Sequence, residues 1–255
     1  MSRTHHPLGI DIGGSGIKGA PVDLDKGVFA TERLRLETPA ESTPKAVAAV
    51  VKEIAEHFAD DTGDSPIGVT VPAVVTHGVV RTAANIDQAW IGTDAEKLLS
   101  DELGRAVVVV NDADAAGVGE LHYGAARDHD GLVLMTTLGT GIGTALLNRG
   151  VLQPNSELGH LELDGHDAES RAASSARENE DLSWEQWAVR LQRYYGHLEN
   201  LLWPDLIVVG GGVSKKADKF LPLLHLRAPI VAAQLQNSAG IVGAAWLAVD
   251  AAGRR

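Results

Sequence analysis

Residues 8–20 read LGIDIGGSGIKGA, and this stretch decides the fold. The apolar run Leu8–Ile12 predicts a short strand that carries Asp11 near its end. Because glycine has no Cβ, Gly13–Gly16 can turn tightly and point backbone N–H groups at one spot. Phosphate oxygens suit such a turn, and a carboxylate beside it suits Mg²⁺, held directly or through water. The stretch therefore predicts a phosphate-binding turn with a candidate metal ligand.

The chain after this turn continues extended rather than helical. Residues 19–24 predict a second strand, and a turn at 25–27 leads into a third at 28–37. A dinucleotide-binding loop would need a helix to begin at the glycines, and a Walker A loop would need Gly-Lys-Ser/Thr. Residues 8–24 provide neither feature. The prediction is a β-hairpin phosphate turn.

The same order of elements recurs in the second half of the chain. Residues 132–143 read LVLMTTLGTGIG, which is a strand followed by another glycine-rich turn and a hairpin. This repetition predicts an internal duplication, with one phosphate turn in each of two domains. We expect these domains at 1–113 and 114–255, the second being the larger, with a closing helix at 239–250 that could pack back on the first.

Helices and strands alternate elsewhere, which indicates an α/β fold. The clearest segments are a capped helix from Thr43-Pro44, a strand at 106–110 that leads into a helix, an aromatic-rich helix at 183–202, and a strand at 205–209 followed by a basic helix start at 214–216.

Composition limits the class of protein. The chain has 255 residues, no cysteine and a formal net charge of −12. Disulfides, thiolate-bound zinc and a cysteine nucleophile are thereby excluded. The acidic balance argues against a nucleic-acid partner, so an anionic substrate must be attracted by a local site. Because residues 1–7 lack an apolar segment and no later stretch reaches membrane-spanning length, we expect a cytoplasmic protein with no membrane partner.

Taken together, the motifs resemble the ROK family of sugar kinases. Those that carry the resemblance are DIGGSGIK at 11–18, NDAD at 111–114, LGTGIG at 138–143, ELGH at 157–160 and VGGG at 209–212. They follow the family's order and span nearly the whole chain. The resemblance implies the two-domain, ribonuclease H-like fold of the actin-like ATPases, with an active site in the interdomain cleft. Further segments at 84–87, 183–187 and 204–218 resemble the bacterial polyphosphate glucokinases.

That resemblance implies transfer of the terminal phosphoryl group of inorganic polyphosphate, with ATP as a second donor, to the 6-hydroxyl of glucose. It also implies Mg²⁺ and a homodimer, with the helix at 183–202 as a candidate interface. One alternative is a strictly ATP-dependent kinase of glucose, mannose or an N-acetylated hexosamine. The other is a sugar-responsive ROK regulator, which would carry an N-terminal DNA-binding domain, whereas the first strand here is expected from Leu8.

The resemblance also implies roles for individual residues. Asp112 matches the catalytic base that accepts the proton of the sugar hydroxyl, although by itself it could equally cap the following helix. Asp11 is the expected Mg²⁺ ligand. The expected glucose-binding residues are Asn85, Asn111, Asp112, Glu157, His160 and Glu169. The expected phosphate-binding residues are Gly13, Gly14, Ser15, Gly16, Lys18, Gly139, Thr140, Gly141, Gly143, Gly211, Gly212, Lys215 and Lys216. For Lys215 and Lys216 a solvated helix face is an equal alternative.

This chain departs from the family at its metal site. ROK kinases follow their Gly-His pair with cysteines that bind structural zinc together with the histidine. Since cysteine is absent here, we expect no structural zinc and a His160 that is available to the sugar. Asp114 stands where the family usually has asparagine, and its role stays open.

Overall fold

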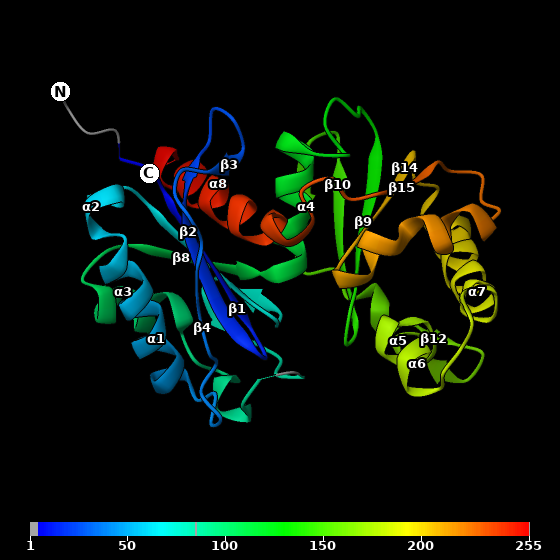
Figure 1. The fold of residues 1–255 in the computed structure, drawn as a ribbon, viewed down its shortest axis with the longest axis horizontal. Coiled ribbons are helices and arrows are strands. Elements are labelled where there is room, and N and C mark those ends of the chain that lie inside the picture. The colour runs from blue at the N-terminus through cyan, green and yellow to red at the C-terminus, as the bar shows by residue number, and fades with distance from the viewer. Residues whose placement is uncertain (1–4, 85, 255) are drawn as a thin grey trace. The chain divides into compact units, whose positions relative to one another are not determined.

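The computed structural model describes residues 5–84 and 86–254, which form two compact units (Figure 1). Unit 1 comprises Met1–Gly119 and Ser238–Arg255, and unit 2 comprises Glu120–Asn237. The first unit therefore extends beyond the residue 113 boundary expected from the sequence, and it includes the closing helix.

Unit 1 is built on a sheet with the strand order β3-β2-β1-β5-β8, in which β4 also pairs with β2. Its strands are β1 (Leu8–Gly13), β2 (Gly16–Asp23), β3 (Val28–Phe29), β4 (Leu34–Leu36), β5 (Ile67–Val71) and β8 (Val107–Asn111). β1 runs antiparallel to β2 and parallel to β5, and β5 runs parallel to β8. The predicted hairpin after the first glycine turn is confirmed.

The single strand predicted at 28–37 is wrong, because the chain makes two short strands there. β3 pairs with Val22 and Asp23, whereas β4 pairs with residues 17–19 of β2. Between these two ladders lies Pro21, which has no N–H to donate, although its carbonyl accepts a hydrogen bond of 2.8 Å from Ala30 N. This gap in the ladder separates β3 from β4.

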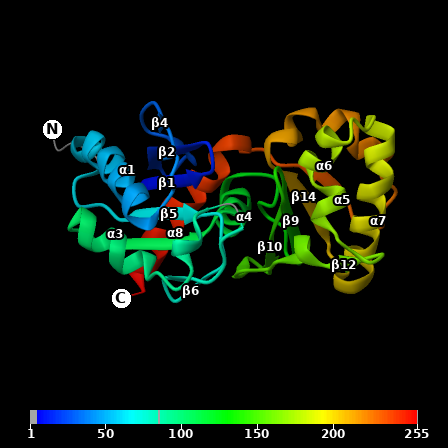
Figure 2. The same cartoon turned by 90° about the horizontal axis from the view of Figure 1, so that it is seen from below.

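Helices cover both faces of the unit 1 sheet. They are α1 (Pro44–His57), α2 (Ala59–Thr62), α3 (Ala95–Leu103), the start of α4 (Asp112–Tyr123) and α8 (Ala239–Gly253), with a short hairpin of β6 (Val75–Thr76) and β7 (Val79–Val80) and the turn η1 (Gln88–Trp90). Thr43 caps α1 as the sequence predicts, by accepting a hydrogen bond from Ala46 N. Figures 1 and 2 show α8 on the face opposite α1 and α3. The sheet is thus buried between helical layers.

Unit 2 repeats this topology. Its sheet has the order β11-β10-β9-β14-β15, built from β9 (Leu132–Leu138), β10 (Ile142–Asn148), β11 (Val151–Gln153), β14 (Leu206–Gly210) and β15 (Ile230–Ala232). β9 runs antiparallel to β10 and parallel to β14, which runs parallel to β15. The duplication predicted from the two glycine-rich stretches is therefore confirmed.

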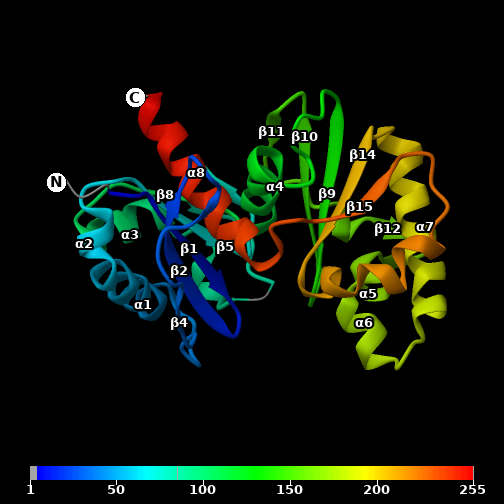
Figure 3. The same cartoon turned by 45° about the horizontal axis from the view of Figure 1, so that its top comes forward.

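The remaining elements of unit 2 include its main helices, which lie together on one side of this sheet (Figures 2 and 3). They are α5 (Glu169–Ala172), α6 (Ser174–Asn179) and α7 (Trp184–Leu202), accompanied by η2 (Leu158–His160), β12 (Glu162–Leu163), β13 (His166–Asp167), η3 (Gly212–Lys219), η4 (Leu221–Leu223) and η5 (Gln236–Ser238). A capping box of Ser183 and Gln186 starts α7, and Trp187 and Tyr194 anchor it in the core. Among the described residues, no helix combines the length and hydropathy that crossing a bilayer would require.

The helix predicted to start at 214–216 is instead η3, a stretch of tight 3-10 turns. Lys216 interrupts it with a non-helical φ of −116° and ψ of 24°. A 3-10 stretch closes fewer favourable hydrogen bonds than an α-helix, and such runs stay short. The basic residues here therefore sit on an irregular segment rather than on the even face of a helix.

Candidate active-site residues

Asp11 lies near the end of β1, and each of its two carboxylate oxygens contacts a side chain of a neighbouring strand. Its Oδ1 accepts a hydrogen bond of 2.9 Å from the Thr70 hydroxyl on β5. Its Oδ2 lies 3.5 Å from Nζ of Lys18, the residue opposite it on β2. Carboxylate oxygens are hard donors of the kind that Mg²⁺ prefers, so this half-buried group fits the expected metal role. Lys18 lies beside Asp11 in an ion pair.

The first glycine turn, Gly13–Gly16, is covered by an arginine. Neither Gly13 nor Gly16 has a left-handed φ, so backbone strain does not explain why Gly16 is glycine. An added Cβ at Gly16 would instead lie 2.7 Å from Nε of Arg35. The Arg35 guanidinium donates a hydrogen bond of 2.7 Å to the Ser15 carbonyl. Glycine at position 16 thus leaves room for a cation against the turn.

Arg35 was not among the residues expected from the sequence. Its alternation with apolar neighbours in Leu34–Leu36 marks a strand, and a basic residue on a strand usually reads as a solvated position. Only the pairing of β4 with β2 brings its side chain to the turn. Nothing in the sequence of Leu34–Leu36 indicates that Arg35 contacts the Gly13–Gly16 turn.

The second glycine turn, between β9 and β10, is covered by a carboxylate. Glu169 Oε2 accepts a hydrogen bond of 2.9 Å from Ile142 N. An added Cβ at Gly141 would lie 2.3 Å from that oxygen. Gly139 N donates to the Gly141 carbonyl at 3.0 Å, and Gly139 O accepts from Ser175 N at 3.1 Å. Two N–H groups of this turn are therefore engaged within the protein: that of Gly139, an expected phosphate-binding residue, and that of Ile142.

The third glycine-rich segment follows β14. Gly211 has a φ of 82°, which favours glycine, and a Cβ added to it would lie 2.3 Å from the carbonyl oxygen of Leu138 at the end of β9. Its carbonyl accepts a hydrogen bond of 2.8 Å from the Ser214 hydroxyl. Lys215 and Lys216 are exposed, and Nζ of Lys216 lies 5.9 Å from the centre of the Trp184 ring. The segment therefore packs against the base of the second turn.

Asn111 and Asp112 stand at the junction of β8 and α4. The Asn111 side chain is buried and caps the helix, because its Oδ1 accepts from Ala113 N at 2.9 Å and from Asp114 N at 3.0 Å. Its Nδ2 donates to the Ala73 carbonyl at 3.1 Å. These contacts use three of the hydrogen bonds that an amide side chain can make, and sugar binding by Asn111 stays a prediction. Asp112 is half-buried, and its Oδ1 accepts a hydrogen bond of 2.8 Å from Ala113 N.

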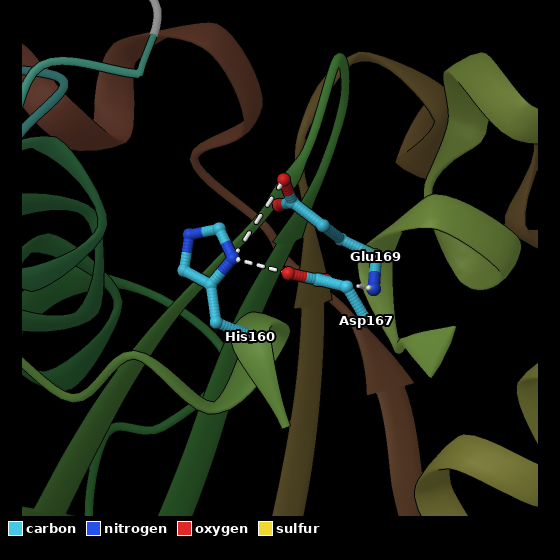
Figure 4. Close-up of side chains that lie close together, drawn as sticks. All are labelled: His160, Asp167 and Glu169. Atoms are coloured by element: carbon cyan, nitrogen blue, oxygen red, sulfur yellow. Dashed lines mark hydrogen bonds and ion pairs between the residues drawn. The ribbon is translucent and has the colours of Figure 1, made fainter. Parts of the chain in front are cut away.

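Three acidic side chains of unit 2 lie around His160, and of these four residues all but Asp167 were expected from the sequence. Figure 4 shows His160 with two of the acids, Asp167 and Glu169. His160 Nδ1 lies 2.9 Å from Asp167 Oδ2 and 3.9 Å from Glu169 Oε1. Its Nε2 lies 3.7 Å from Glu157 Oε2. Asn85, the remaining expected sugar ligand, lies outside the described residues. Asp167 is the member that the sequence analysis missed, since an acid in a charged stretch has no distinguishing signal.

The charges in this cluster act on one another. The hydrogen bond to Asp167, helped by the charges of Glu169 and Glu157, raises the pKa of His160 above its ordinary value of 6.5. Loss of water around Glu157 raises the pKa of that carboxyl, an effect that the nearby His160 opposes. The cluster therefore offers both donors and acceptors for hydroxyl groups.

His160, Asp167 and Glu169 each offer a ligand atom within 4.8 Å of the others, a spacing that a cation could use. The set lacks the thiolates that structural zinc sites usually contain. The absence of structural zinc stays a prediction.

Comparisons with known proteins agree with these motifs. The model of the ROK family matches residues 7–172. The chain is 53% identical over 245 residues to the polyphosphate glucokinase of Mycobacterium tuberculosis, an alignment that covers 96% of this chain and 91% of that protein. It is 52% identical over 242 residues to the polyphosphate glucokinase of Mycobacterium leprae, covering 94% of this chain and 74% of that protein.

Two solved structures extend the comparison. The inorganic polyphosphate/ATP-glucomannokinase of Arthrobacter sp. strain KM superposes with a TM-score of 0.93 at 51% identity, covering 99% of this chain and 100% of that one. A ROK family glucokinase from Streptomyces griseus, in complex with glucose and AMPPNP, superposes with a TM-score of 0.83 at 25% identity, covering 96% of this chain and 99% of that one.

Proposed function

The chain belongs to the ROK family, and from this premise we propose that it is a polyphosphate-dependent glucokinase. It transfers the terminal phosphoryl group of inorganic polyphosphate, with ATP as a second donor, to the 6-hydroxyl of glucose. The observation that carries this proposal is the 53% identity to a polyphosphate glucokinase over 96% of the chain. The likeness to a polyphosphate/ATP-glucomannokinase supports ATP as the second donor and makes mannose a second candidate acceptor.

Asp112 serves as the general base in this reaction. A neutral hydroxyl is a poor nucleophile, so a carboxylate that accepts its proton helps the oxygen to attack the terminal phosphorus. The position of Asp112, where a buried strand ends and a helix begins, supports this role because both elements fix its backbone.

Asp11 and the first glycine turn serve the phosphoryl donor. Asp11 would hold Mg²⁺, because its carboxylate is half-buried and already oriented by Thr70. When bound, the ion would neutralise charge on the donor phosphates. Backbone N–H groups of Gly13–Gly16 supply hydrogen bonds to phosphate oxygens. The second turn, with Thr140 and Gly143, contributes weaker phosphate contacts, because the Glu169 carboxylate already binds Ile142 N there. The segment at Gly211 and Gly212 contributes further phosphate contacts.

Glu157, His160 and Glu169 bind the sugar. Hydroxyl groups both donate and accept hydrogen bonds, and this set of two carboxylates and an imidazole matches that pattern.

The experiment that tests the function is a two-donor assay. Purified protein is given polyphosphate or ATP, with glucose, mannose or N-acetylglucosamine as acceptor and Mg²⁺ present, and the sugar phosphate is measured. We expect transfer from polyphosphate to glucose. Transfer from ATP alone would establish the strictly ATP-dependent kinase instead. No transfer from either donor, combined with sugar-dependent retention of DNA in a gel shift, would establish the regulator.

We further propose a homodimer. Val189 is 70% exposed on α7, an apolar side chain that a dimer contact would bury, which supports this helix as the interface. Light scattering on the eluting protein measures its mass, and a Val189→Glu variant should shift that mass toward the monomer. The cytoplasmic location stays a prediction from the sequence.

A further inference from the structure

Three charged residues form a row across neighbouring strands beside the first glycine turn. Lys18 on β2 lies opposite Asp11 on β1 and opposite Arg35 on β4. Side chains directly opposite one another in a sheet share a face. The ion pair of Asp11 with Lys18 at 3.5 Å confirms that the first two side chains meet. The row therefore contains two cations and one carboxylate.

This arrangement has no evident benefit for stability. Like charges placed directly opposite one another in a sheet are destabilising, and Lys18 and Arg35 are such a pair. Arg35 is exposed, so its hydrogen bond to the Ser15 carbonyl adds little to the free energy of unfolding. In a chain with a net charge of −12, a concentration of positive charge at a phosphate turn calls for another explanation.

The guanidinium is held where a phosphate chain would need it. One of its N–H groups bonds Ser15 O, and the group lies against Gly16 at 2.7–2.9 Å from the position of an added Cβ. A guanidinium has five N–H donors in a rigid fork that matches the oxygens of a phosphate. Arg35 can keep its bond to the turn and still present donors to an anion bound there.

We propose that Arg35, acting with Lys18, binds the phosphate chain of the donor beside the Gly13–Gly16 turn. This inference rests on the proposed function, since it assigns a further residue to the donor site. The ligand class is a linear chain of phosphoryl groups, which polyphosphate and the triphosphate of ATP share. Polyphosphate carries negative charge along its whole length, so a cation outside the turn reaches phosphates beyond the one transferred.

The first test compares Arg35→Gln, Arg35→Lys and a control of equal charge change, Lys97→Gln. Lys97 pairs with Asp101 on the exposed face of α3, away from the row. We expect Arg35→Gln to raise the KM for polyphosphate about tenfold, with the KM for glucose and the thermal midpoint close to those of the parent. Arg35→Lys should recover part of the loss, because it keeps the charge but not the fork. Lys97→Gln should behave as the parent.

The second test uses Gly16. In Gly16→Ala the new methyl group must displace the guanidinium. If Gly16 is glycine in order to admit Arg35, then Gly16→Ala raises the KM for polyphosphate in the parent and adds almost nothing in the Arg35→Gln background. Full additivity of the two effects would contradict the proposed contact.

Binding of tripolyphosphate, measured by calorimetry without glucose, separates this inference from the proposed function. A parent that binds tripolyphosphate and an Arg35→Gln variant that binds it about tenfold more weakly support Arg35 whatever the transfer assay shows. A parent that transfers from polyphosphate while Arg35→Gln leaves both binding and KM within twofold overturns the role of Arg35 alone. If Arg35→Gln raised the KM for ATP but not that for polyphosphate, the proposed role of Arg35 would also be overturned, because the contact would then be to the nucleoside.

Discussion

The two glycine turns of this protein have the same topology and opposite chemistry. In unit 1 the glycine at position 16 admits the guanidinium of Arg35 against the turn, whereas in unit 2 Gly141 admits the carboxylate of Glu169. Each glycine is explained by the charged group that lies against it, since neither has a left-handed φ. The duplicated backbone thus carries a cation at one turn and an anion at the other.

This difference suggests that the two turns serve different substrates, the first turn the phosphoryl donor and the second turn the sugar. An anion is attracted to N–H groups backed by a cation, and it is repelled from N–H groups already bound to a carboxylate. Phosphate therefore suits the first turn better than the second. Glu169 also lies 3.9 Å from His160, so the second turn is tied to the residues proposed to bind sugar.

The largest expected effect concerns the reaction itself. Asp112→Asn keeps the shape of the side chain but removes its ability to accept a proton, so kcat should fall by about 10³-fold. Glucose binding, measured by calorimetry, should change little. Near-normal turnover in Asp112→Asn would show that the base is another residue.

The next effect tests the anionic turn directly. Glu169→Gln removes a charge that holds Ile142 N and faces His160, so the KM for glucose should rise about tenfold while the KM for polyphosphate stays near the parent value. Steady-state kinetics with each substrate varied in turn provides both constants. If the KM for polyphosphate rose as much as that for glucose, the two turns would not divide their substrates.

A smaller effect should follow from Gly141→Ala. Its methyl group would lie 2.3 Å from Oε2 of Glu169 and must push that carboxylate away, so we expect a rise of about fivefold in the KM for glucose. The matched variant Gly16→Ala should act on the donor instead. If both alanine variants raised the KM for the same substrate, the proposal that the two turns serve different substrates would be wrong.

The smallest effect concerns Asp167, which holds His160 by a hydrogen bond of 2.9 Å. Because this bond raises the pKa of His160, Asp167→Asn should lower that pKa, as followed by the NMR titration of the imidazole. The KM for glucose should rise about threefold as the ring loses its fixed orientation. Glu162→Gln, on the exposed strand β12, serves as the control.

The raised pKa of His160 also makes the free energy of unfolding depend on pH. A raised pKa in the folded protein means that protonated His160 stabilises the fold below its ordinary value of 6.5, and that this contribution disappears as the pH rises through the folded pKa. The side chain is 46% exposed, so the contribution to the free energy of unfolding is small. Asp167→Asn should reduce the fall in thermal midpoint across this pH range.

Much of the fold was predictable because its signals are local. The alternation of apolar residues, the capping of α1 by Thr43 and the repeat of strand and glycine turn all lie within short segments. Residues 28–37 were predicted as one continuous strand, whereas the structure has the two short strands β3 and β4. The interruption could not be predicted, because the effect of Pro21 depends on the strand that pairs with it. The basic segment at 214–216 was predicted to start a helix, whereas the structure has 3-10 turns there, interrupted at Lys216.

The candidate site divides in the same way. The motifs, together with the resemblance to the ROK family, predicted roles for Asp11, Glu157, His160 and Glu169. The structure gives the contacts of Asp11 within unit 1 and those of the other three within unit 2. Asn111 was expected to bind sugar, and the structure adds a second role that the sequence did not predict, since its side chain caps α4. Arg35 and Asp167 carry no local signal, because each acquires its role from a residue distant in the chain or across a turn.

The sequence by itself determined that this chain has two glycine turns at strand ends, that they are related by duplication, and that it belongs among the ROK sugar kinases. Those features depend on residue type and spacing, which the chain carries in any conformation. Tertiary structure alone decided which charge covers each turn. Strand pairing brought Arg35 to the first turn and the start of α5 brought Glu169 to the second, and neither partner could be assigned before the backbone had folded.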